Sequence, residues 1–243
     1  MVGLTVHQLL NGDNMILITG ASKGVGHFLY KELKKNGFDV IGTYNSTHEK
    51  EVETDPNYFK VDISNYNSVE NWLSAIQVKL NDIVLINCAG ISYNSFAHKS
   101  DIYEWKNVID VNVTGTFNVI RNILPLMREQ NYGRIINFGS VVCQLPTPGI
   151  SAYAASKAAL NGLTKVLAVE NASKGITVNS INLGYVSVGM GVEQVPLVYQ
   201  EKMKNQIPAG RFCEPIEIYN TIIYLINTEY VNGSILDING GIV

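Results

Sequence analysis

The sequence has little charge. Charged residues make up 16% of its 243 residues, hydrophobic residues make up 46%, and the formal net charge is −3. Lys and Arg form no dense cluster, which argues against a nucleic-acid-binding protein. A chain with this much apolar material and this little charge is globular rather than disordered.

Long apolar runs are also missing. A membrane-spanning helix needs about 18 or more consecutive apolar residues, whereas the longest runs here, Met15–Thr19 and Ile83–Ile86, have the length of strands. The N-terminal residues have no cationic start and no long apolar block, so no secretory signal is expected. We therefore expect a protein without membrane contact.

Cysteines are few. Cys88, Cys143 and Cys213 are odd in number and lack the spacing of metal ligands. This usage predicts reduced thiols in a cytoplasmic protein, and no bound metal.

Strand-like and helix-like patterns alternate along the chain. Short apolar runs predict strands at 15–19, 39–43, 58–61, 82–87, 134–138, 176–181 and 234–238. Apolar residues at helical spacing predict helices at 25–33, 69–80, 105–120, 151–171 and 216–226, with Phe117 on the apolar face of the third. Such an order forms a parallel sheet with helices on both faces. We predict one α/β domain, residues 1–243, with a doubly wound parallel sheet.

Residues 184–206 interrupt this alternation. The stretch has little periodicity and contains Gly189, Gly191 and Pro196. Irregular stretches of this length in compact domains are commonly functional, so we expect a substrate lid.

A glycine-rich turn lies between the first predicted strand and the first predicted helix. Its sequence is Thr19-Gly-Ala-Ser-Lys-Gly-Val-Gly26. Glycines allow the backbone to approach a phosphate closely, and the helix N-terminus behind them offers free N–H groups. At the start of a β-α series this turn predicts a nucleotide site, although the glycine spacing differs from G-x-G-x-x-G.

Tyr153 and Lys157 lie four residues apart, on one face of a predicted helix. Lowering a tyrosine pKa from about 10 to about 7 takes about 4 kcal/mol. A positive charge about 4 Å away offers about that much at an effective dielectric near 20, so we expect Lys157 to lower the pKa of Tyr153. The same spacing recurs at Tyr30 and Lys34, which we interpret as a solvated helical pair.

Two polar residues accompany Tyr153. Ser140 follows the strand at 134–138, at the strand end where open α/β sheets bind ligands, and its hydroxyl could bind a substrate carbonyl. Asn112 interrupts a helical pattern and could hold a water that relays protons.

Together these residues resemble the classical short-chain dehydrogenase/reductase family. The motifs are Thr19-Gly-x-x-x-Gly-x-Gly26, Asp62, Asn87-Cys-Ala-Gly90, Asn112, Ser140 and Tyr153-x-x-x-Lys157, over residues 15–243. The resemblance implies a Rossmann-type fold and a catalytic set of Asn112, Ser140, Tyr153 and Lys157. Tyr153 would be the general acid in reduction, Ser140 would orient the substrate oxygen, and Lys157 would hold the nicotinamide ribose.

The same resemblance implies a cofactor site and partners. The cofactor-binding residues would be Gly20, Ser22, Lys23, Gly24, Val25, Gly26, Tyr44, Asn45, Ser46, Asp62, Ile63, Asn87, Ala89, Gly90, Tyr153, Lys157, Gly184 and Val186. Within the family the strongest likeness is to 3-oxoacyl-[acyl-carrier-protein] reductases, through phrases such as Ile207-Pro-Ala-Gly-Arg-Phe212. That likeness implies fatty acid biosynthesis, a small-molecule or carrier-linked carbonyl substrate, and a homotetramer or homodimer.

The chain departs from the family pattern in two places. The family usually reads Pro-Gly-x-x-x-Thr after the sixth strand, and here Leu183 and Val188 replace the Pro and the Thr. The hydroxyl that would bind the nicotinamide carboxamide is therefore missing, unless the neighbouring Ser187 supplies it. Cys88 replaces the commoner second Asn of the family.

The segment after the second strand predicts the cofactor. In this family a carboxylate there commonly receives the adenosine ribose and selects NAD, but residues 40–47 contain no Asp or Glu. Tyr44 takes that position, Asn45, Ser46 and Thr47 offer neutral donors, and Lys23 adds a positive charge. We predict NADP(H) over NAD(H).

The sequence thus predicts an NADPH-dependent reductase of a carbonyl compound, with a 3-oxoacyl thioester as the leading substrate. Two alternatives stay open: a short-chain dehydrogenase/reductase acting on another ketone or alcohol, such as a polyketide or sugar, and a non-catalytic nucleotide-sensing protein.

Overall fold

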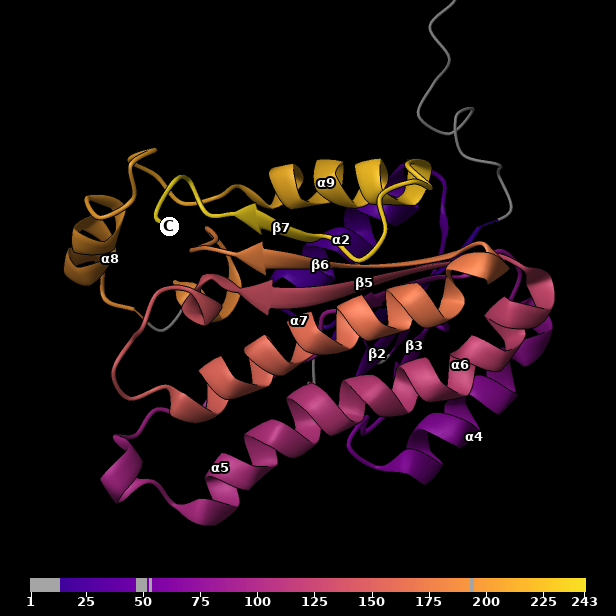
Figure 1. Ribbon diagram of the computed structural model, residues 1–243, viewed down its shortest axis with the longest axis horizontal. Helices are drawn as coiled ribbons and strands as arrows, with labels where there is room; N and C mark the ends of the chain where they lie inside the picture. The colour runs from indigo at the N-terminus through magenta and orange to yellow at the C-terminus, as the bar shows by residue number, and fades with distance from the viewer. Residues whose placement is uncertain (1–13, 47–51, 53, 193–194) are drawn as a thin grey trace, which may run out of the picture.

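The protein is built on one seven-stranded sheet (Figure 1). The computed structural model describes residues 14–46, 52, 54–192 and 195–243, so Thr47 lies outside the described residues. The strands run in the spatial order β3-β2-β1-β4-β5-β6-β7, and every neighbouring pair is parallel. Their bounds are β1 (Met15–Thr19), β2 (Asp39–Tyr44), β3 (Tyr58–Lys60), β4 (Val84–Asn87), β5 (Gly133–Ser140), β6 (Ile176–Leu183) and β7 (Ile235–Ile238). The predicted fold class is confirmed.

Helices cover both faces of the sheet. One face carries α2 (Gly24–Lys35) and α9 (Pro215–Asn227), and the other carries α4 (Tyr66–Ile76), α6 (Thr116–Gln130) and α7 (Ser151–Asn171). Neighbouring residues of β1 belong to different cores: Ile16 and Ile18 pack with the first pair of helices, and Leu17 packs with the second group. Burial on both faces explains why the strands read as continuous apolar runs rather than as alternating patterns.

The predicted helix over 105–120 is wrong as a single element. The structure has α5 (Ile102–Ile109), a π-helical segment at Asp110–Gly115, and then α6. Hydrogen bonds in a π turn span one residue more than in an α-helix, which rotates the following residues around the axis. Phe117 is consequently 44% exposed rather than part of the apolar face.

The stretch 184–206 is less irregular than its sequence suggests. It contains a short 3₁₀ segment at Gly189–Gly191 and a helix, α8 (Leu197–Lys204). None of the residues in α8 is buried, so the helix has no apolar stripe that a pattern could reveal. In Figure 1, α8 lies at the edge where the arrows of β5, β6 and β7 end. A role as substrate lid stays a prediction.

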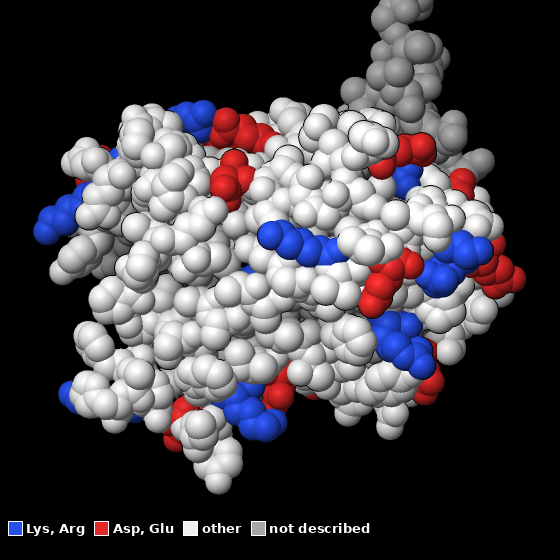
Figure 2. Space-filling model, in the orientation of Figure 1, with Lys and Arg blue, Asp and Glu red and all other residues white. Residues whose placement is uncertain are grey.

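The strand order reverses between β1 and β4, which are neighbours in the sheet although β2 and β3 separate them in the chain. In open α/β sheets ligands bind outside the carboxyl ends of the strands at such a reversal. Charged side chains on the face shown in Figure 2 are scattered in small groups between broad uncharged areas. Among the described residues, no helix is long and apolar enough to cross a bilayer.

Candidate active site

The glycine-rich turn leads from β1 into α2 in the conformation that a phosphate site needs. Gly20 and Gly24 have φ angles of +68° and +54°, where a side chain would strain the backbone. A Cβ on Gly20 would also lie 2.6 Å from the Cα of Ala89, and one on Gly26 would lie 2.3 Å from the Gly20 carbonyl oxygen. The turn therefore requires glycine at these positions for space as well as for conformation.

The first turn of α2 suits an anion. No side chain caps the helix at Lys23, and its first turn holds no acidic residue. The N–H groups at a helix start carry partial positive charge and lack partners within the helix. A dinucleotide pyrophosphate fits this end of the helix.

The end of β4 supplies the other side of the cofactor site. Ala89 N–H donates to the Thr19 hydroxyl at 3.2 Å, which ties β4 to the turn. The Asn87 amide donates to Asn137 Oδ1 at 2.9 Å, whereas the buried Asn87 Oδ1 has no partner among the described residues. A Cβ on Gly90 would lie 3.5 Å from Lys157 Nζ. An orphaned polar atom and this close approach fit a polar cofactor along β4.

Asn112 links this region to α7. Its Nδ2 donates to the Ile91 carbonyl at 2.9 Å and to Ser156 Oγ at 3.0 Å, and Ile91 N–H donates to its Oδ1 at 2.8 Å. Ser156 Oγ in turn donates to the Tyr153 carbonyl at 2.7 Å. The π-helical segment places this fully buried amide, and a role in a proton relay stays a prediction.

Lys157 is buried beside the end of β5. Its Nζ donates to the Phe138 carbonyl at 2.7 Å, and only 4% of the residue is exposed. Burial penalises the charged ammonium, and the pKa of Lys157 falls to about 8.

The pKa of Tyr153 moves opposite to the sequence-based expectation. Burial raises it to about 12, while a hydrogen bond from Ser140 acts in the lowering direction. Lys157 Nζ lies 5.6 Å from the centre of the Tyr153 ring, and its charge does not offset the burial. The expected lowering by Lys157 is therefore wrong for the protein itself. Tyr153 stays protonated at neutral pH, which is the state that a proton donor needs.

In the second Tyr–Lys pair Lys34 is exposed, as predicted, but Tyr30 is buried, so the prediction of a solvated pair is wrong for Tyr30. Tyr30 is 3% exposed, and its hydroxyl donates to Asp55 Oδ2 at 2.7 Å. Lys34 Nζ donates to the same carboxylate at 3.0 Å and to the Tyr30 oxygen at 3.2 Å. Burial and the neighbouring carboxylate raise the pKa of Tyr30. The pair is a structural link between α2 and the segment before β3.

The remaining predicted cofactor residues lie at or just beyond strand ends. Tyr44 is half-buried at the end of β2, and Asn45, Ser46 and Lys23 are exposed. Asp62 follows β3 and accepts hydrogen bonds from Ser64 through Oδ1. Ile63 is buried beside it, Ser22 and Val25 lie in the glycine-rich turn and the start of α2, and Gly184 and Val186 follow β6. Parallel strands bring all of these carboxyl ends to one edge of the sheet.

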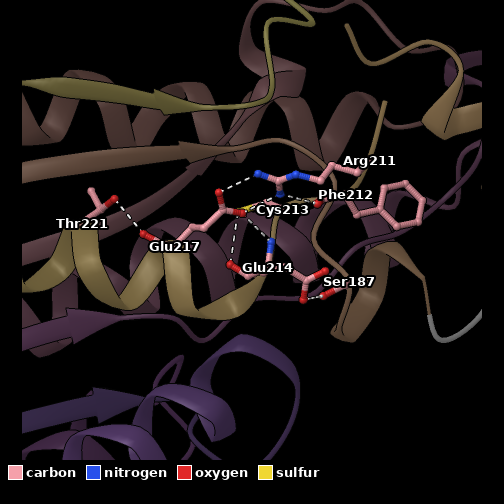
Figure 3. A network of polar contacts seen from close by, with 7 residues as sticks. All are labelled: Ser187, Arg211, Phe212, Cys213, Glu214, Glu217 and Thr221. Atoms are coloured by element: carbon pink, nitrogen blue, oxygen red, sulfur yellow. Dashed lines mark hydrogen bonds and ion pairs between the residues drawn. The ribbon is translucent and has the colours of Figure 1, made fainter. Parts of the chain in front are cut away.

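The segment after β6 is held by hydrogen bonds to the start of α9 that the sequence does not predict. Cys213 N–H donates to the Tyr185 carbonyl at 2.9 Å, and Ser187 N–H donates to the Cys213 carbonyl at 3.0 Å. Figure 3 shows the Ser187 hydroxyl pointing to Glu214, with a 3.0 Å hydrogen bond to Oε2. The Ser187 hydroxyl is therefore engaged with the start of α9, and its substitution for the missing hydroxyl stays a prediction.

The start of α9 is itself firmly tied (Figure 3). Arg211 binds both carboxylate oxygens of Glu217, at 2.8 and 2.9 Å, and the backbone N–H of Glu214 donates to the same carboxylate at 2.8 Å. These bonds lower the pKa of Glu217 to about 2. Glu214 and Glu217 form a capping box with Pro215 at the first helical position. That spacing is a helix-start signal visible in the sequence.

All three cysteines are free, as predicted. Burial raises the pKa of the Cys88 thiol to about 11 and that of Cys213 to about 12, and it also raises the pKa of Cys143. Thiols in this state are poor nucleophiles at neutral pH.

We expect the substitution Val188→Thr to tighten binding of the nicotinamide cofactor about two- to tenfold, because it restores one neutral hydrogen bond. Val188 is partly buried against the core, and threonine has a similar shape. Isothermal titration with NADPH measures the effect, and Val188→Ala, which removes side-chain bulk without adding a hydroxyl, is the control. Affinity that stays equal or falls in Val188→Thr contradicts the prediction.

Comparison with known proteins adds independent information. Residues 14–196 match the family model described as short chain dehydrogenase. An acetoacetyl-CoA reductase from Shinella zoogloeoides is 36% identical over 237 residues, which cover 94% of this chain and 98% of the relative. A 3-oxoacyl-[acyl-carrier-protein] reductase FabG from Staphylococcus aureus is 33% identical, with coverage of 93% and 96%. An acetoacetyl-CoA reductase from Paracoccus denitrificans is 35% identical over 225 residues, with coverage of 90% and 93%.

Proposed function

The chain belongs to the short-chain dehydrogenase family and is an NAD(P)-dependent oxidoreductase, and on this premise we propose that it reduces 3-oxoacyl thioesters with NADPH. The observation that carries the proposal is the convergence at the end of β5. Ser140, Tyr153 and the buried Lys157 meet there, and the Asn112 amide links the same helix, through Ser156, to Ile91 after β4. The relatives named for acetoacetyl-CoA and 3-oxoacyl reduction support the substrate class.

Ser140, Tyr153 and Lys157 would each have a separate role in the reduction of a carbonyl group. When bound, the reduced nicotinamide supplies the hydride that reaches the carbonyl carbon. Ser140 would donate a hydrogen bond to the carbonyl oxygen, and Tyr153 would transfer its phenolic proton to that oxygen as negative charge develops there. The high pKa of Tyr153 keeps that proton available. Lys157 would stabilise the phenolate left behind, since any positive charge near the ring favours that anion.

The cofactor would lie across the reversal of the sheet. The pyrophosphate would sit at the start of α2, the adenosine near the ends of β2 and β3, and the nicotinamide between Gly90 and the segment after β6. Support for NADPH comes from the end of β2, where Tyr44, Asn45 and Ser46 include no carboxylate and Lys23 is exposed.

Steady-state turnover tests the proposal. We expect the purified protein to oxidise NADPH with acetoacetyl-CoA and with a 3-oxoacyl carrier-protein thioester, at a higher kcat/KM than with simple ketones or keto sugars. A higher kcat/KM with a ketone or sugar would show that the thioester assignment is wrong. Binding of NADPH without turnover of any carbonyl would favour the nucleotide-sensing alternative.

Three further predictions from the resemblance concern the biosynthetic role, the oligomeric state and the location in the cell. A role in fatty acid biosynthesis would follow if carrier-protein thioesters are the better substrates. The homotetrameric or homodimeric state and the cytoplasmic location stay predictions.

A further inference from the structure

The backbone of Ala21, in the middle of the glycine-rich phosphate turn, is held at both its N–H and its carbonyl. Ala21 is fully buried, and its N–H donates to the Thr43 carbonyl of β2 at 2.8 Å. Its carbonyl oxygen accepts a hydrogen bond of 3.0 Å from the hydroxyl of Tyr58, the first residue of β3. Two neighbouring strands therefore hold the turn, one through its backbone and the other through a side chain.

A missing side chain lets Tyr58 reach the turn. Gly42 of β2 pairs with Tyr58 in the sheet. A Cβ on Gly42 would lie 2.9 Å from Tyr58 Cε1 and 3.1 Å from Tyr30 Cδ2. The two tyrosine rings occupy the space over this glycine, with their centres 4.2 Å apart. Glycine is therefore required at position 42, because a side chain there would clash with the two tyrosine rings.

The hydrogen bonds at the Tyr58 oxygen have a defined direction. A phenol has one proton, and Tyr58 gives it to the Ala21 carbonyl. The 3.3 Å contact between the Tyr58 oxygen and His27 Nδ1 is then a donation from the imidazole. His27 lies in the first turn of α2. The Tyr58 hydroxyl therefore connects the turn, the start of the helix and the edge strand.

This arrangement bears directly on anion binding. A carbonyl oxygen carries partial negative charge, so one that faced a phosphate would repel it. In a trans peptide the carbonyl and the following N–H point in opposite directions. Holding the Ala21 oxygen at Tyr58 therefore directs the Ser22 N–H to the other side of the turn. An ordered turn also loses less conformational entropy when a ligand binds.

We propose that Tyr58 is a positioning residue for the dinucleotide, because its hydroxyl fixes the Ala21 carbonyl and keeps the phosphate turn in its binding conformation. This inference rests on the dinucleotide site of the proposed function. It assigns Tyr58 no contact with the cofactor and no part in the chemistry, so its effect is on cofactor affinity rather than on kcat.

Tyr30 is a matched control for Tyr58. The two rings pack against each other at an interplanar angle of 35°, and the hydroxyl of each donates a hydrogen bond. The Tyr30 hydroxyl, however, donates to Asp55 rather than to the turn. Replacing either tyrosine by phenylalanine keeps both rings, and only Tyr58→Phe removes the hydrogen bond to the Ala21 carbonyl.

The experiment compares Tyr58→Phe and Tyr30→Phe with the unmodified protein. Isothermal titration with NADPH and with NADH gives the Kd values, thermal unfolding without cofactor gives the Tm, and steady-state assays separate KM from kcat. We expect Tyr58→Phe to raise the Kd of both cofactors about fivefold, since one neutral hydrogen bond to the turn is lost. The kcat at saturating cofactor should stay within about twofold. Tyr30→Phe should lower the Tm and leave both Kd values within about twofold.

Three other outcomes would contradict the inference, and they can be told apart. An unmodified protein that binds neither NADPH nor NADH overturns both the proposed function and the role of Tyr58. Normal binding by the unmodified protein, with unchanged Kd values in Tyr58→Phe, overturns the role of Tyr58 alone. Equal weakening in both variants shows general loosening of the β2–β3 edge and also overturns it.

Discussion

The substitution Tyr153→Phe is expected to reduce kcat by at least about 10²- to 10⁴-fold, the usual contribution of a general acid. Phenylalanine keeps the ring and removes only the hydroxyl that carries the transferable proton. Because the pKa of Tyr153 is about 12, the proton is present throughout the neutral range. Binding of NADPH should be largely retained.

Steady-state kinetics and a direct titration with NADPH check this prediction. Tyr30→Phe is the control, since Tyr30 and Lys34 have the same spacing as Tyr153 and Lys157 but lie in a separate cluster with Asp55. We expect the control to keep near-normal kcat, with some loss of stability from the broken hydrogen bond. Near-normal turnover in Tyr153→Phe would remove the proposed mechanism.

The substitution Lys23→Ala is expected to weaken NADPH about tenfold or more and to leave NADH nearly unchanged. Lys23 is exposed where the turn enters α2, and no acidic residue occupies the described end of β2 to repel a 2′-phosphate. A charge-assisted hydrogen bond contributes about 1.5–3 kcal/mol, which corresponds to at least about tenfold in affinity. NADH has no 2′-phosphate and so loses nothing comparable.

The measurement is kcat/KM and Kd for both cofactors in both proteins. Lys35→Ala is a suitable control, because it removes the same charge from the opposite end of α2, where Lys35 has an exposed 3.5 Å contact with Glu32. Equal or better efficiency with NADH in the unmodified protein would overturn the predicted preference. Equal losses for NADPH and NADH in Lys23→Ala would show that Lys23 supports the turn rather than the 2′-phosphate.

The sequence by itself determined the sheet and brought Tyr153 and Lys157, the proposed catalytic pair, to one face of a helix. Strands buried on both faces must be apolar throughout, so runs such as Met15–Thr19 are visible without any tertiary information. Glycine positions that need positive φ, and a Tyr and a Lys one helical turn apart, are likewise local features. The predicted helix at 151–171 coincides with α7 for the same reason.

Only the tertiary structure decided the features that depend on partners distant in the chain. The π-helical segment at Asp110–Gly115 brings the Asn112 amide within hydrogen-bond distance of Ile91 and Ser156. The same segment breaks the regular helical spacing on which the prediction of Phe117 in the apolar face depended. Burial raised the pKa of Tyr153, because desolvation depends on everything packed around the ring. The Ser187 hydroxyl donates to Glu214, and the Tyr58 hydroxyl donates to the Ala21 carbonyl in the space that Gly42 leaves open. Spacing along a chain reports which residues share a face, whereas hydrogen bonds and desolvation depend on which faces meet.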